Sequence, residues 1–527
     1  MYNENLIVKD WRVIDFSFGL IYPNVYKIGM SSYSIRLLYD LINSYDNIAC
    51  ERIFLPDNIK FPASCDYSSE NFVRSIENKV LPRDFDILGF SLHFENDFRN
   101  ILWILEKANI PITFQKRQEL IRNENFNFPL IIGGGPVVTS NPTSLSKIFD
   151  ILFIGDAEPN LDMFFKLFQD YKDQRISYSK FLNDLKIIEG IYIPSLNNKA
   201  KRAVLKNLDN SPIPINQLMV KLSKYESIFE RNFFIETNRG CPYQCKFCIS
   251  SFHNSPFRNR SYENIITVID NALEILDFDT FSLIGSCVSS HPKFQQICEY
   301  IISRGKRLTL PSLRIEHLTP EIIQILESGG IKTITVAPEA GSESLRYALG
   351  KMISNDKIIS VLSQIKDSEI RNVKFYFLIG LPNENEKDIE EIIDLLKSID
   401  KLGFKSNSLR VNINPLIPKL NTPYEKKINF YFDKELNKLI LKYQKIEKEL
   451  KKLHSIKIKF MKYKTIVKNA RLQTLISLGD NKVSDVLINY YQNGANFGAL
   501  KKAEKNLHFL MDNYLLKIKE CYSPWKI

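Results

Sequence analysis

Three cysteines stand within eight consecutive positions of the chain, Cys241, Cys245 and Cys248, in the segment IETNRGCPYQCKFCIS. Thiolate sulfur binds zinc and iron–sulfur clusters. Three thiolates can hold three irons of a 4Fe–4S cluster and leave the fourth iron open for another ligand, whereas a structural zinc needs four protein ligands. His253 could supply a fourth zinc ligand, and Cys287 is the nearest other cysteine. The spacing of the three cysteines favours the cluster.

The segments around these cysteines predict where they lie. They follow an apolar run, FFIETN, and a turn at Arg239–Gly240. Further apolar runs alternate with helical segments, among them TFSLIGS, TITVAPEAG and VKFYFLIGLP. Six such strand–helix repeats predict a partial (β/α)6 barrel over residues 231–427, with its chemistry at the carboxyl ends of the strands. The cysteines are therefore expected on the first strand-to-helix loop, at the reactive end.

Residues 1–200 show a second alternating series, which includes FDILGFSLHF, FPLIIGGGPVV and FDILFIGDAE. Near-continuous apolar strands separated by helices predict an α/β domain with a doubly wound parallel sheet. Three glycines, Gly133–Gly135, follow one strand, where such sheets bind ligands, although a plain tight turn explains them as well. We interpret residues 201–230 as a linker and residues 428–527 as a helical C-terminal domain.

The apolar content and the net charge of the chain indicate where the protein is located and which partners it binds. The 527 residues are 44% apolar with no run of about 18 apolar residues, and the start lacks the apolar core of a signal peptide, so we expect a cytoplasmic protein. The net charge is +11, and lysines recur between Lys434 and Arg471. These lysines form either a solvated helix face or a surface for phosphate. We predict peripheral contact with an anionic membrane surface through Lys442, Lys445 and Lys452, and no nucleic-acid partner.

The pattern C-x-x-x-C-x-aromatic-C, with Phe247 at the aromatic position, resembles the signature of the radical SAM superfamily. The resemblance implies that Cys241, Cys245 and Cys248 hold a 4Fe–4S cluster, whose open iron binds the amino and carboxylate groups of S-adenosylmethionine. Electron transfer, from a reducing partner such as ferredoxin or flavodoxin, then gives methionine and a 5′-deoxyadenosyl radical. The protein contributes orientation, exclusion of water and redox tuning.

Later segments also resemble this superfamily. VAPEAGSESL resembles its fourth-strand segment, FLIGLP its fifth and NPLIPKLNTP its sixth, where backbone meets adenine. One departure is LIGSCVSSHP, which stands where many members carry Gly-Gly-Glu-Pro. A barrel-rim ion pair is the alternative role for Arg314 and Glu339. The resemblance assigns these residues to cofactor binding: Phe247, Gly285, Ser286, Ser289, Arg314, Glu339, Ser342, Gly380 and Pro382.

The N-terminal region resembles the cobalamin-binding-type domain that is fused to many radical SAM enzymes, on segments such as IIGGGPVVTSNP and FIGDAEP. Such domains usually bind the corrinoid with an Asp-x-His-x-x-Gly motif, and none of the six histidines stands in that context. We interpret His93 as a packed or surface side chain. We therefore expect an enzyme without corrinoid, with cobalamin binding as the alternative.

Three functions follow from these observations. The first is hydrogen abstraction from an unactivated carbon of an apolar or lipid substrate, ending in carbon–carbon bond formation. Relatives of this layout include the archaeal enzymes that modify tetraether membrane lipids. The second is cobalamin-dependent radical methylation, or methylthiolation, of a small molecule, peptide or tRNA, although the chain lacks the second cysteine cluster that sulfur insertion usually needs. The third is a non-catalytic iron–sulfur binding or sensor protein.

Overall fold

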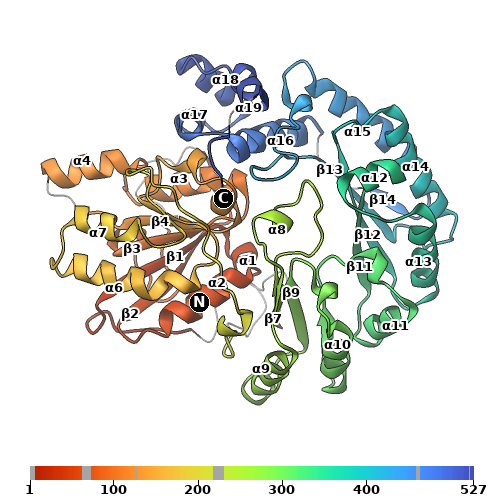
Figure 1. Ribbon diagram of the computed structural model, residues 1–527, viewed down its shortest axis with the longest axis horizontal. Coiled ribbons are helices and arrows are strands. Elements are labelled where there is room, and N and C mark those ends of the chain that lie inside the picture. Colours follow the sequence, from red (N-terminus) through yellow and green to blue (C-terminus); the bar gives the residue numbers. More distant parts are fainter. Residues whose placement is uncertain are drawn as a thin grey trace. The chain divides into compact units, whose positions relative to one another are not determined.

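The computed structural model describes residues 6–61, 73–124, 127–217, 231–458, 463–520 and 523–526. The chain forms two compact units: unit 1 contains Met1–Arg231 and Leu475–Ile527, and unit 2 contains Asn232–Thr474 (Figure 1). Two of the scattered cysteines, Cys65 and Cys521, lie outside the described residues.

Unit 1 is built on a six-stranded sheet in the order β2-β1-β3-β4-β5-β6. The strands are β1 (Phe16–Val25), β2 (Ile48–Leu55), β3 (Ile87–Ser91), β4 (Leu130–Gly134), β5 (Ile151–Phe153) and β6 (Ile191–Tyr192). All neighbours pair in parallel except β6, which runs antiparallel to β5. Every residue of β2 is buried, as expected for a strand covered on both faces. The predicted parallel α/β sheet is confirmed.

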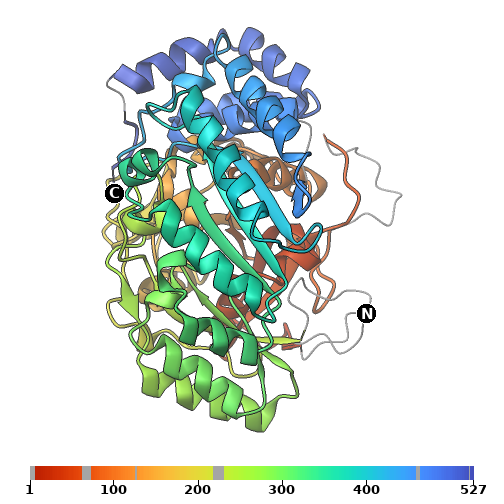
Figure 2. The same ribbon diagram turned by 90° about the vertical axis from the view of Figure 1, so that its right-hand side faces the viewer.

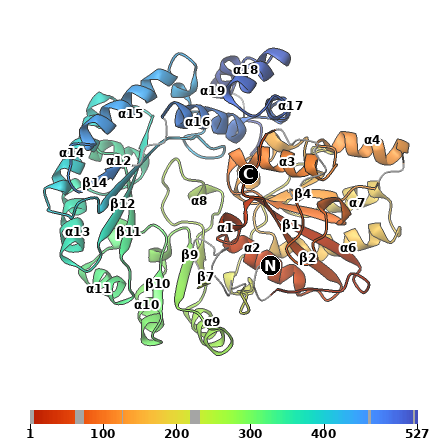
Figure 3. The ribbon, with the colours of Figure 1, turned by 180° about the vertical axis from the view of Figure 1, so that it is seen from behind.

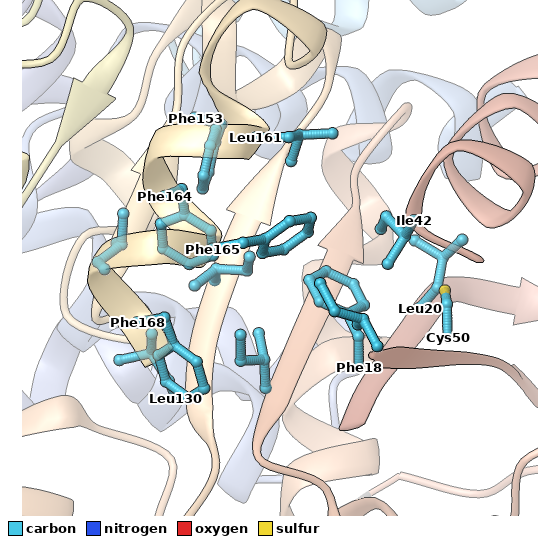
Figure 4. Packing of buried hydrophobic residues seen from close by; sticks show 14 of the residues in the cluster. Phe18, Leu20, Ile42, Cys50, Leu130, Phe153, Leu161, Phe164, Phe165 and Phe168 are labelled. Atoms are coloured by element: carbon cyan, nitrogen blue, oxygen red, sulfur yellow. The ribbon is translucent and has the colours of Figure 1, made fainter. Parts of the chain in front are cut away.

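Helices cover both faces of this sheet (Figure 1). They are α1 (Tyr26–Gly29), α2 (Tyr33–Asn43), α3 (Phe98–Lys107), α4 (Phe114–Glu124), α5 (Pro136–Ser140), α6 (Leu161–Lys172) and α7 (Tyr178–Leu185). Helices α2, α6 and α7 bring their apolar faces to one hydrophobic cluster on the sheet (Figure 4). Within it the Phe16 ring lies 5.1 Å from that of Phe168 and 5.6 Å from that of Phe165.

The C-terminal residues complete unit 1 and do not form a domain of their own. The helices here are α16 (Tyr463–Leu478), α17 (Asn481–Gln492), α18 (Phe497–Asn506) and α19 (Met511–Glu520). Asn141 donates its amide to the carbonyls of Ile476 and Gly479, at 3.0 and 2.8 Å, and Lys147 pairs with Asp485 at 2.6 Å. The expected helical domain over 428–527 is thus divided, with residues 428–474 in unit 2 and the rest in unit 1.

Unit 2 contains two four-stranded sheets, in the orders β10-β9-β7-β8 and β11-β12-β13-β14. Their strands are β7 (Asn232–Arg239), β8 (Arg258–Asn259), β9 (Thr280–Gly285), β10 (Arg307–Thr309), β11 (Thr333–Glu339), β12 (Asn372–Ile379), β13 (Leu409–Pro415) and β14 (Ile456–Ile458). A parallel bridge between Leu313 and Val336 joins the two sheets. The series β7, β9, β10, β11, β12, β13 is the predicted six-stranded partial barrel, and β14 adds a short parallel strand.

Helices alternate with the strands of unit 2 along the chain. They are α8 (Ile249–Phe252), α9 (Tyr262–Ile275), α10 (Phe294–Ser303), α11 (Pro320–Ser328), α12 (Glu343–Leu349), α13 (Asn355–Asp367), α14 (Glu386–Asp400) and α15 (Leu436–Leu450). Figure 3 shows α10, α11, α13 and α14 on the outer side of the strands, and in Figure 2 these helices face the viewer.

Two lysines of the basic stretch form ion pairs within the fold. Lys442 is 6% exposed and forms an ion pair with Glu384. Lys445 pairs with Glu386 and Glu390 of α14, at 3.3 and 2.8 Å. Glu384 lies just before α14, and helix α15 packs against α14, so both lysines meet acidic side chains of this region. Lys442 is buried in its ion pair and is not available to a lipid surface. No helix in the described ranges is long and apolar enough to cross a membrane.

Candidate active site

The cysteine loop begins where β7 ends and runs to the short helix α8. Its first turn depends on Gly240, which has φ +76°. A Cβ atom there would lie 2.4 Å from the Asn254 carbonyl oxygen, so only glycine fits this backbone. Cys241 therefore follows directly from the carboxyl end of the first barrel strand, as the sequence predicts.

The far side of the loop is held by the end of α12. The Lys246 amide donates to the Leu349 carbonyl at 2.9 Å, and Cys245 Sγ donates to the Gly350 carbonyl at 4.0 Å. Gly350 has φ +90°, and a Cβ atom on it would lie 2.9 Å from the Gln244 carbonyl oxygen. The left-handed glycine that ends α12 thus allows the cysteine loop to pack directly on this helix.

Two cations face Cys245. The Arg314 guanidinium carbon lies 3.5 Å from the centre of the Tyr243 ring, and the same group forms an ion pair with Glu316. Burial raises the pKa of the Cys245 thiol, while Lys351 and Arg314 oppose that rise. Positive charge beside a buried thiol stabilises its thiolate, which is the form that binds metal.

Glu339 ends β11 in a conformation that is uncommon for a residue with a side chain, with φ +71°. Its carboxylate is 2.9 Å from Lys351 Nζ, and Lys351 also donates to the Ala337 carbonyl at 2.5 Å. Non-glycine residues in this backbone region are often found at functional sites. The barrel-rim ion pairs considered for Arg314 and Glu339 are therefore present, and both lie by the cysteine loop.

A fourth thiol, that of Cys287, meets the loop. The Cys241 thiol donates a hydrogen bond to Cys287 Sγ, which raises the pKa of Cys241 and lowers that of Cys287 to about 6. Cys287 is buried, and its Sγ lies 3.0 Å from the Ser290 hydroxyl. Sequence reasoning assigned no role to Cys287, although it stands in the LIGSCVSSHP segment that departs from the family pattern.

A hydrogen-bonded histidine links this segment to the cysteine loop. His317 Nε2 contacts the Tyr243 hydroxyl at 2.6 Å, and its Nδ1 contacts the Ser289 hydroxyl at 2.8 Å. Burial lowers the pKa of His317, so the neutral imidazole can donate at one nitrogen and accept at the other. Sequence reasoning missed Tyr243, His317 and Lys351, and only the position of Tyr243 inside the cysteine motif was a signal.

Three further residues that the resemblance assigns to cofactor binding are Ser342, Ser286 and Gly285, and each has a different environment. Ser342 caps α12, since its hydroxyl accepts from the Leu345 amide at 3.2 Å and donates to Asp388 at 2.6 Å. This hydroxyl is thus already engaged within the fold. Ser286 is exposed, and Gly285 packs so closely on Asn238 that a Cβ atom would lie 2.4 Å from the Asn238 Oδ1.

Three more predicted residues lie where unit 2 packs its interior. Phe247 is partly buried and packs against an apolar cluster composed of Ala340, Leu345, Leu349, Leu381, Leu416 and Tyr424. The Gly380 amide donates to Glu384 at 3.0 Å, so this predicted cofactor-binding residue is held by a carboxylate that also binds Lys442. Pro382 is partly buried in the turn that follows.

The donor set suits an iron–sulfur cluster better than zinc. No three or more His, Cys, Asp or Glu side chains within the described ranges surround a common metal position. His253, the alternative zinc ligand, is buried and donates from Nε2 to the Leu420 carbonyl at 2.7 Å. Cys241, Cys245 and Cys248 are instead thiols on one loop that lies at the carboxyl end of a barrel strand, with cations beside it. This set offers three sulfur ligands to a 4Fe–4S cluster, whose fourth iron then takes an external ligand.

The carboxyl ends of the strands in unit 1 carry a smaller polar group. His93 follows β3, is exposed, and contacts the hydroxyls of Ser34 and Ser91 through Nε2, at 3.0 and 3.2 Å. The Tyr22 ring lies 5.4 Å from the imidazole. His93 was interpreted as a packed or surface side chain, and its exposure agrees with a surface position. Gly135 lies between β4 and α5 near the same end.

Comparison with known proteins gives a family for both halves of the chain. Residues 34–194 match the model for the N-terminal region of radical SAM proteins, and residues 235–396 match the radical SAM superfamily model. An uncharacterized protein of Methanocaldococcus jannaschii is 28% identical over 509 residues, which are 96% of this chain and 97% of that protein. An uncharacterized methyltransferase of Pyrococcus horikoshii is 26% identical over 54% of this chain and 60% of its own length.

Solved structures share the fold. The cobalamin-dependent radical enzyme OxsB with aqua-cobalamin bound aligns over 95% of this chain and 78% of its own, with a TM-score of 0.54 and 13% identity. The radical S-adenosylmethionine methyltransferase TsrM from Kitasatospora setae aligns over 77% of this chain and 76% of its own, with a TM-score of 0.52 and 13% identity. With both family models matched and the cysteine loop at the reactive end of the barrel, the chain belongs to the radical SAM superfamily and is an enzyme that uses a 4Fe–4S cluster and S-adenosylmethionine.

Proposed function

We propose that Cys241, Cys245 and Cys248 hold the cluster, and that unit 2 directs the resulting 5′-deoxyadenosyl radical to an unactivated carbon of the substrate. The observation that carries this proposal is the meeting of the cysteine loop with two cations, Arg314 and Lys351, beside the buried Cys245. Reductive cleavage of S-adenosylmethionine is the chemistry that the cluster supplies when bound. The electron comes from a small reductant such as ferredoxin or flavodoxin.

The chain's own residues orient the reactants and set their charge. Arg314 and Lys351 offset negative charge at the cysteine loop, and either one could pair with the carboxylate of S-adenosylmethionine. The neighbouring backbone at Gly285 and Ser286 has the position that holds the amino group in many members of the family. Glu339 ends the adjacent strand β11 and is suited to the polar part of the cofactor.

The assignment of the three cysteines is tested by single substitutions. Replacing Cys241, Cys245 or Cys248 with Ala should remove most of the iron and abolish formation of 5′-deoxyadenosine and methionine. Cys298→Ala is the matched control, because Cys298 is a fully buried thiol on α10 and outside the site. Full iron content in the three loop variants, or stoichiometric zinc in the anaerobically prepared wild type, would contradict the assignment.

For the step after cleavage we propose cobalamin-dependent radical methylation of the substrate carbon. The support is that OxsB, a cobalamin-dependent enzyme, aligns over 95% of this chain, and that TsrM, a methyltransferase, shares the fold. A corrinoid would use the carboxyl ends of the strands of unit 1, where His93, Ser34 and Ser91 are grouped. This differs from the expectation drawn from the missing Asp-x-His-x-x-Gly motif.

That missing motif supports a second candidate, carbon–carbon bond formation in archaeal tetraether lipids. Without a corrinoid, the reactivity of the radical itself remains, and ring closure or chain joining on an apolar substrate uses the same hydrogen abstraction. This candidate would place the enzyme at a membrane surface as a peripheral protein. The burial of Lys442 leaves any such contact to other basic residues.

Two measurements separate the candidates. Methylation predicts stoichiometric corrinoid in protein expressed with cobalamin available, seen in the absorption spectrum, and a methyl group missing from a metabolite or macromolecule when the gene is deleted. Lipid modification predicts protein without corrinoid, and core lipids with fewer rings or unlinked chains in the deletion strain. Methylthiolation would show instead as loss of a sulfur-containing tRNA or protein modification.

A further inference from the structure

Strands β12 and β13 of unit 2 have one buried face and one open face. On β12 the residues Val373, Phe375 and Phe377 are buried, and those that alternate with them are partly buried or exposed. Strand β13 shows the same alternation. Helices α13 and α14 lie on the outer side of the strands (Figure 3), so the buried residues face these helices and the others point to the inner side of the partial barrel. An open face is unusual for a parallel sheet, which is generally covered on both faces.

Three basic side chains stand in one row across this inner face. Lys374 of β12 is paired in register with Arg410 of β13, and Arg410 is paired with Lys457 of β14. Residues paired in this way project from the same face of a sheet, and neighbouring strands are about 4.8 Å apart. Arg410 and Lys457 are exposed, and Lys374 is partly buried. We call Lys374, Arg410 and Lys457 the basic row.

The cations of the basic row have no counter-charge in the fold. Among the described residues, none of the three side chains forms an ion pair or a hydrogen bond. Other buried lysines of unit 2 are paired, as Lys351 is with Glu339 and Lys442 is with Glu384. Like charges on neighbouring strands repel one another and destabilise a sheet. A bound anion would remove this repulsion, so the basic row has the property expected of a ligand site.

The inner face of β12 leads from the basic row to the candidate active site. Tyr376 and Leu378 follow Lys374 on this face, and Leu378 packs against the same apolar cluster as Phe247 of the cysteine loop. Tyr376 is 37% exposed, and Asn412 is paired with it on β13. At about 3.3 Å per residue, the basic row lies roughly 13 Å from Leu378, toward the amino ends of the strands. The open face therefore connects the reactive end of the barrel with three unpaired cations.

We propose that the basic row binds a phosphate or diphosphate group of the substrate, and that the carbon to be modified lies nearer Leu378, at the reactive end. The inference rests on the proposed function, because it takes the 5′-deoxyadenosyl radical to be formed at the cysteine loop. Arginine and lysine are common partners of phosphate, and the arginine fork donates to two oxygens at once. Three cations suit a group with two or more negative charges, so the proposal names a phosphorylated substrate and disfavours an uncharged one.

The test is the binding of inorganic pyrophosphate to the anaerobically reconstituted full-length chain, measured by calorimetry and by thermal unfolding at low ionic strength. The basic-row variant carries Lys374→Gln, Arg410→Gln and Lys457→Gln. The matched control loses the same three positive charges at exposed lysines outside the row, through Lys357→Gln, Lys401→Gln and Lys405→Gln.

We expect pyrophosphate to raise the melting temperature of the wild type and of the control, because it binds the folded state. The basic-row variant should bind pyrophosphate about tenfold more weakly, or less. Without pyrophosphate, this variant should melt at a higher temperature than the wild type, because the repulsion within the row is gone. The control should not show this gain.

Two results overturn the inference and leave the proposed function intact: a wild type that pyrophosphate does not stabilise, and equal binding by the basic-row variant and the control. If the basic-row variant does not fold, the single variant Arg410→Gln, at an exposed position, decides by the same comparison. A wild type that forms no cluster overturns the proposed function, while its binding of pyrophosphate still decides whether the row holds an anion.

The source of the phosphate is identified with a second probe, the short-chain lipid dihexanoyl phosphatidic acid. Tighter binding of this lipid than of pyrophosphate, lost in the basic-row variant, supports a lipid headgroup. Tighter binding of pyrophosphate supports a small phosphorylated metabolite. Binding of the lipid that is unchanged in the basic-row variant contradicts a headgroup at this row.

Discussion

Arg314 places its guanidinium carbon 3.5 Å from the centre of the Tyr243 ring, so a cation from the loop after β10 lies against the cysteine loop after β7. Tyr243 stands between Cys241 and Cys245, and its hydroxyl is bound by His317. A cation over an aromatic ring in a partly buried setting contributes up to about 2 kcal/mol. Arg314 therefore both orders the loop and supplies charge to it.

Arg314→Ala should weaken the binding of S-adenosylmethionine at least tenfold and make the cluster harder to reduce, because a positive charge next to the ligating thiolates is lost. The control is Arg304→Ala on α10. Arg304 also pairs with an acid, Asp270, and lies over a tyrosine ring, with 5.2 Å to the Tyr300 centroid. Calorimetric affinity and the cluster midpoint should change only in the Arg314 variant.

Gly350→Ala should disturb the cysteine loop. The new Cβ atom would lie 2.9 Å from the Gln244 carbonyl in a backbone with φ +90°, so the loop must shift away from α12. We expect a loss of about 1–2 kcal/mol in stability and lower iron content. Gly305→Ala has a similar φ of +71° with nothing within 4 Å of the new atom, so it should lose stability but keep its iron.

Phe247 has both a packing role and a predicted cofactor role, and two substitutions separate them. Phe247→Ala should lower stability by about 1–3 kcal/mol through lost burial. It should also weaken S-adenosylmethionine binding by about 1–3 kcal/mol if the ring packs on the adenine side. Phe247→Leu restores most of the apolar contact but no ring, so it should recover the stability and not the affinity. If Phe247→Leu recovered the stability and the affinity equally, Phe247 would only pack against the apolar cluster that includes Leu345 and Leu381.

Asp97 should make the stability of unit 1 depend on pH. Burial raises the pKa of this carboxyl to about 7, against an ordinary value near 3.8, despite opposing contributions from Arg99 and Asn24. The folded state therefore binds more protons than the unfolded state between these values, and stability falls as pH rises from about 4 to 7. Asp97→Asn should raise the melting temperature at pH 8 and change it little at pH 4. Asp84→Asn, at an exposed position, should show no such difference between the two pH values.

The sequence was sufficient for features that repeat along the chain. Apolar runs alternating with helical segments predicted both parallel folds, and the turn at Arg239–Gly240 placed the cysteine loop at the carboxyl end of β7. Contacts between distant segments could not be predicted in this way. The hydrogen bonds from Asn141 to residues 476 and 479 join parts more than 300 positions apart, and they assign the C-terminal helices to unit 1.

The same limit applies within the site. The contact of Cys287 with Cys241 depends on β9 being the neighbour of β7, and the contact of Lys351 with Glu339 depends on how α12 ends. Ser342 was predicted from its motif, but the structure uses its hydroxyl to cap α12 and bind Asp388. Residue type and spacing therefore identified the chemistry, while strand order decided which side chains surround it.

The most direct test of the account is one assay on the anaerobically reconstituted wild type, reduced in the presence of S-adenosylmethionine. The account predicts about four irons per chain, a resonance signal of a reduced 4Fe–4S cluster that changes when S-adenosylmethionine binds, and equal amounts of methionine and 5′-deoxyadenosine. A chain that holds the cluster but yields neither product would be a binding or sensor protein. A chain that holds one zinc and no iron would contradict the central claim, that the three cysteines hold a 4Fe–4S cluster.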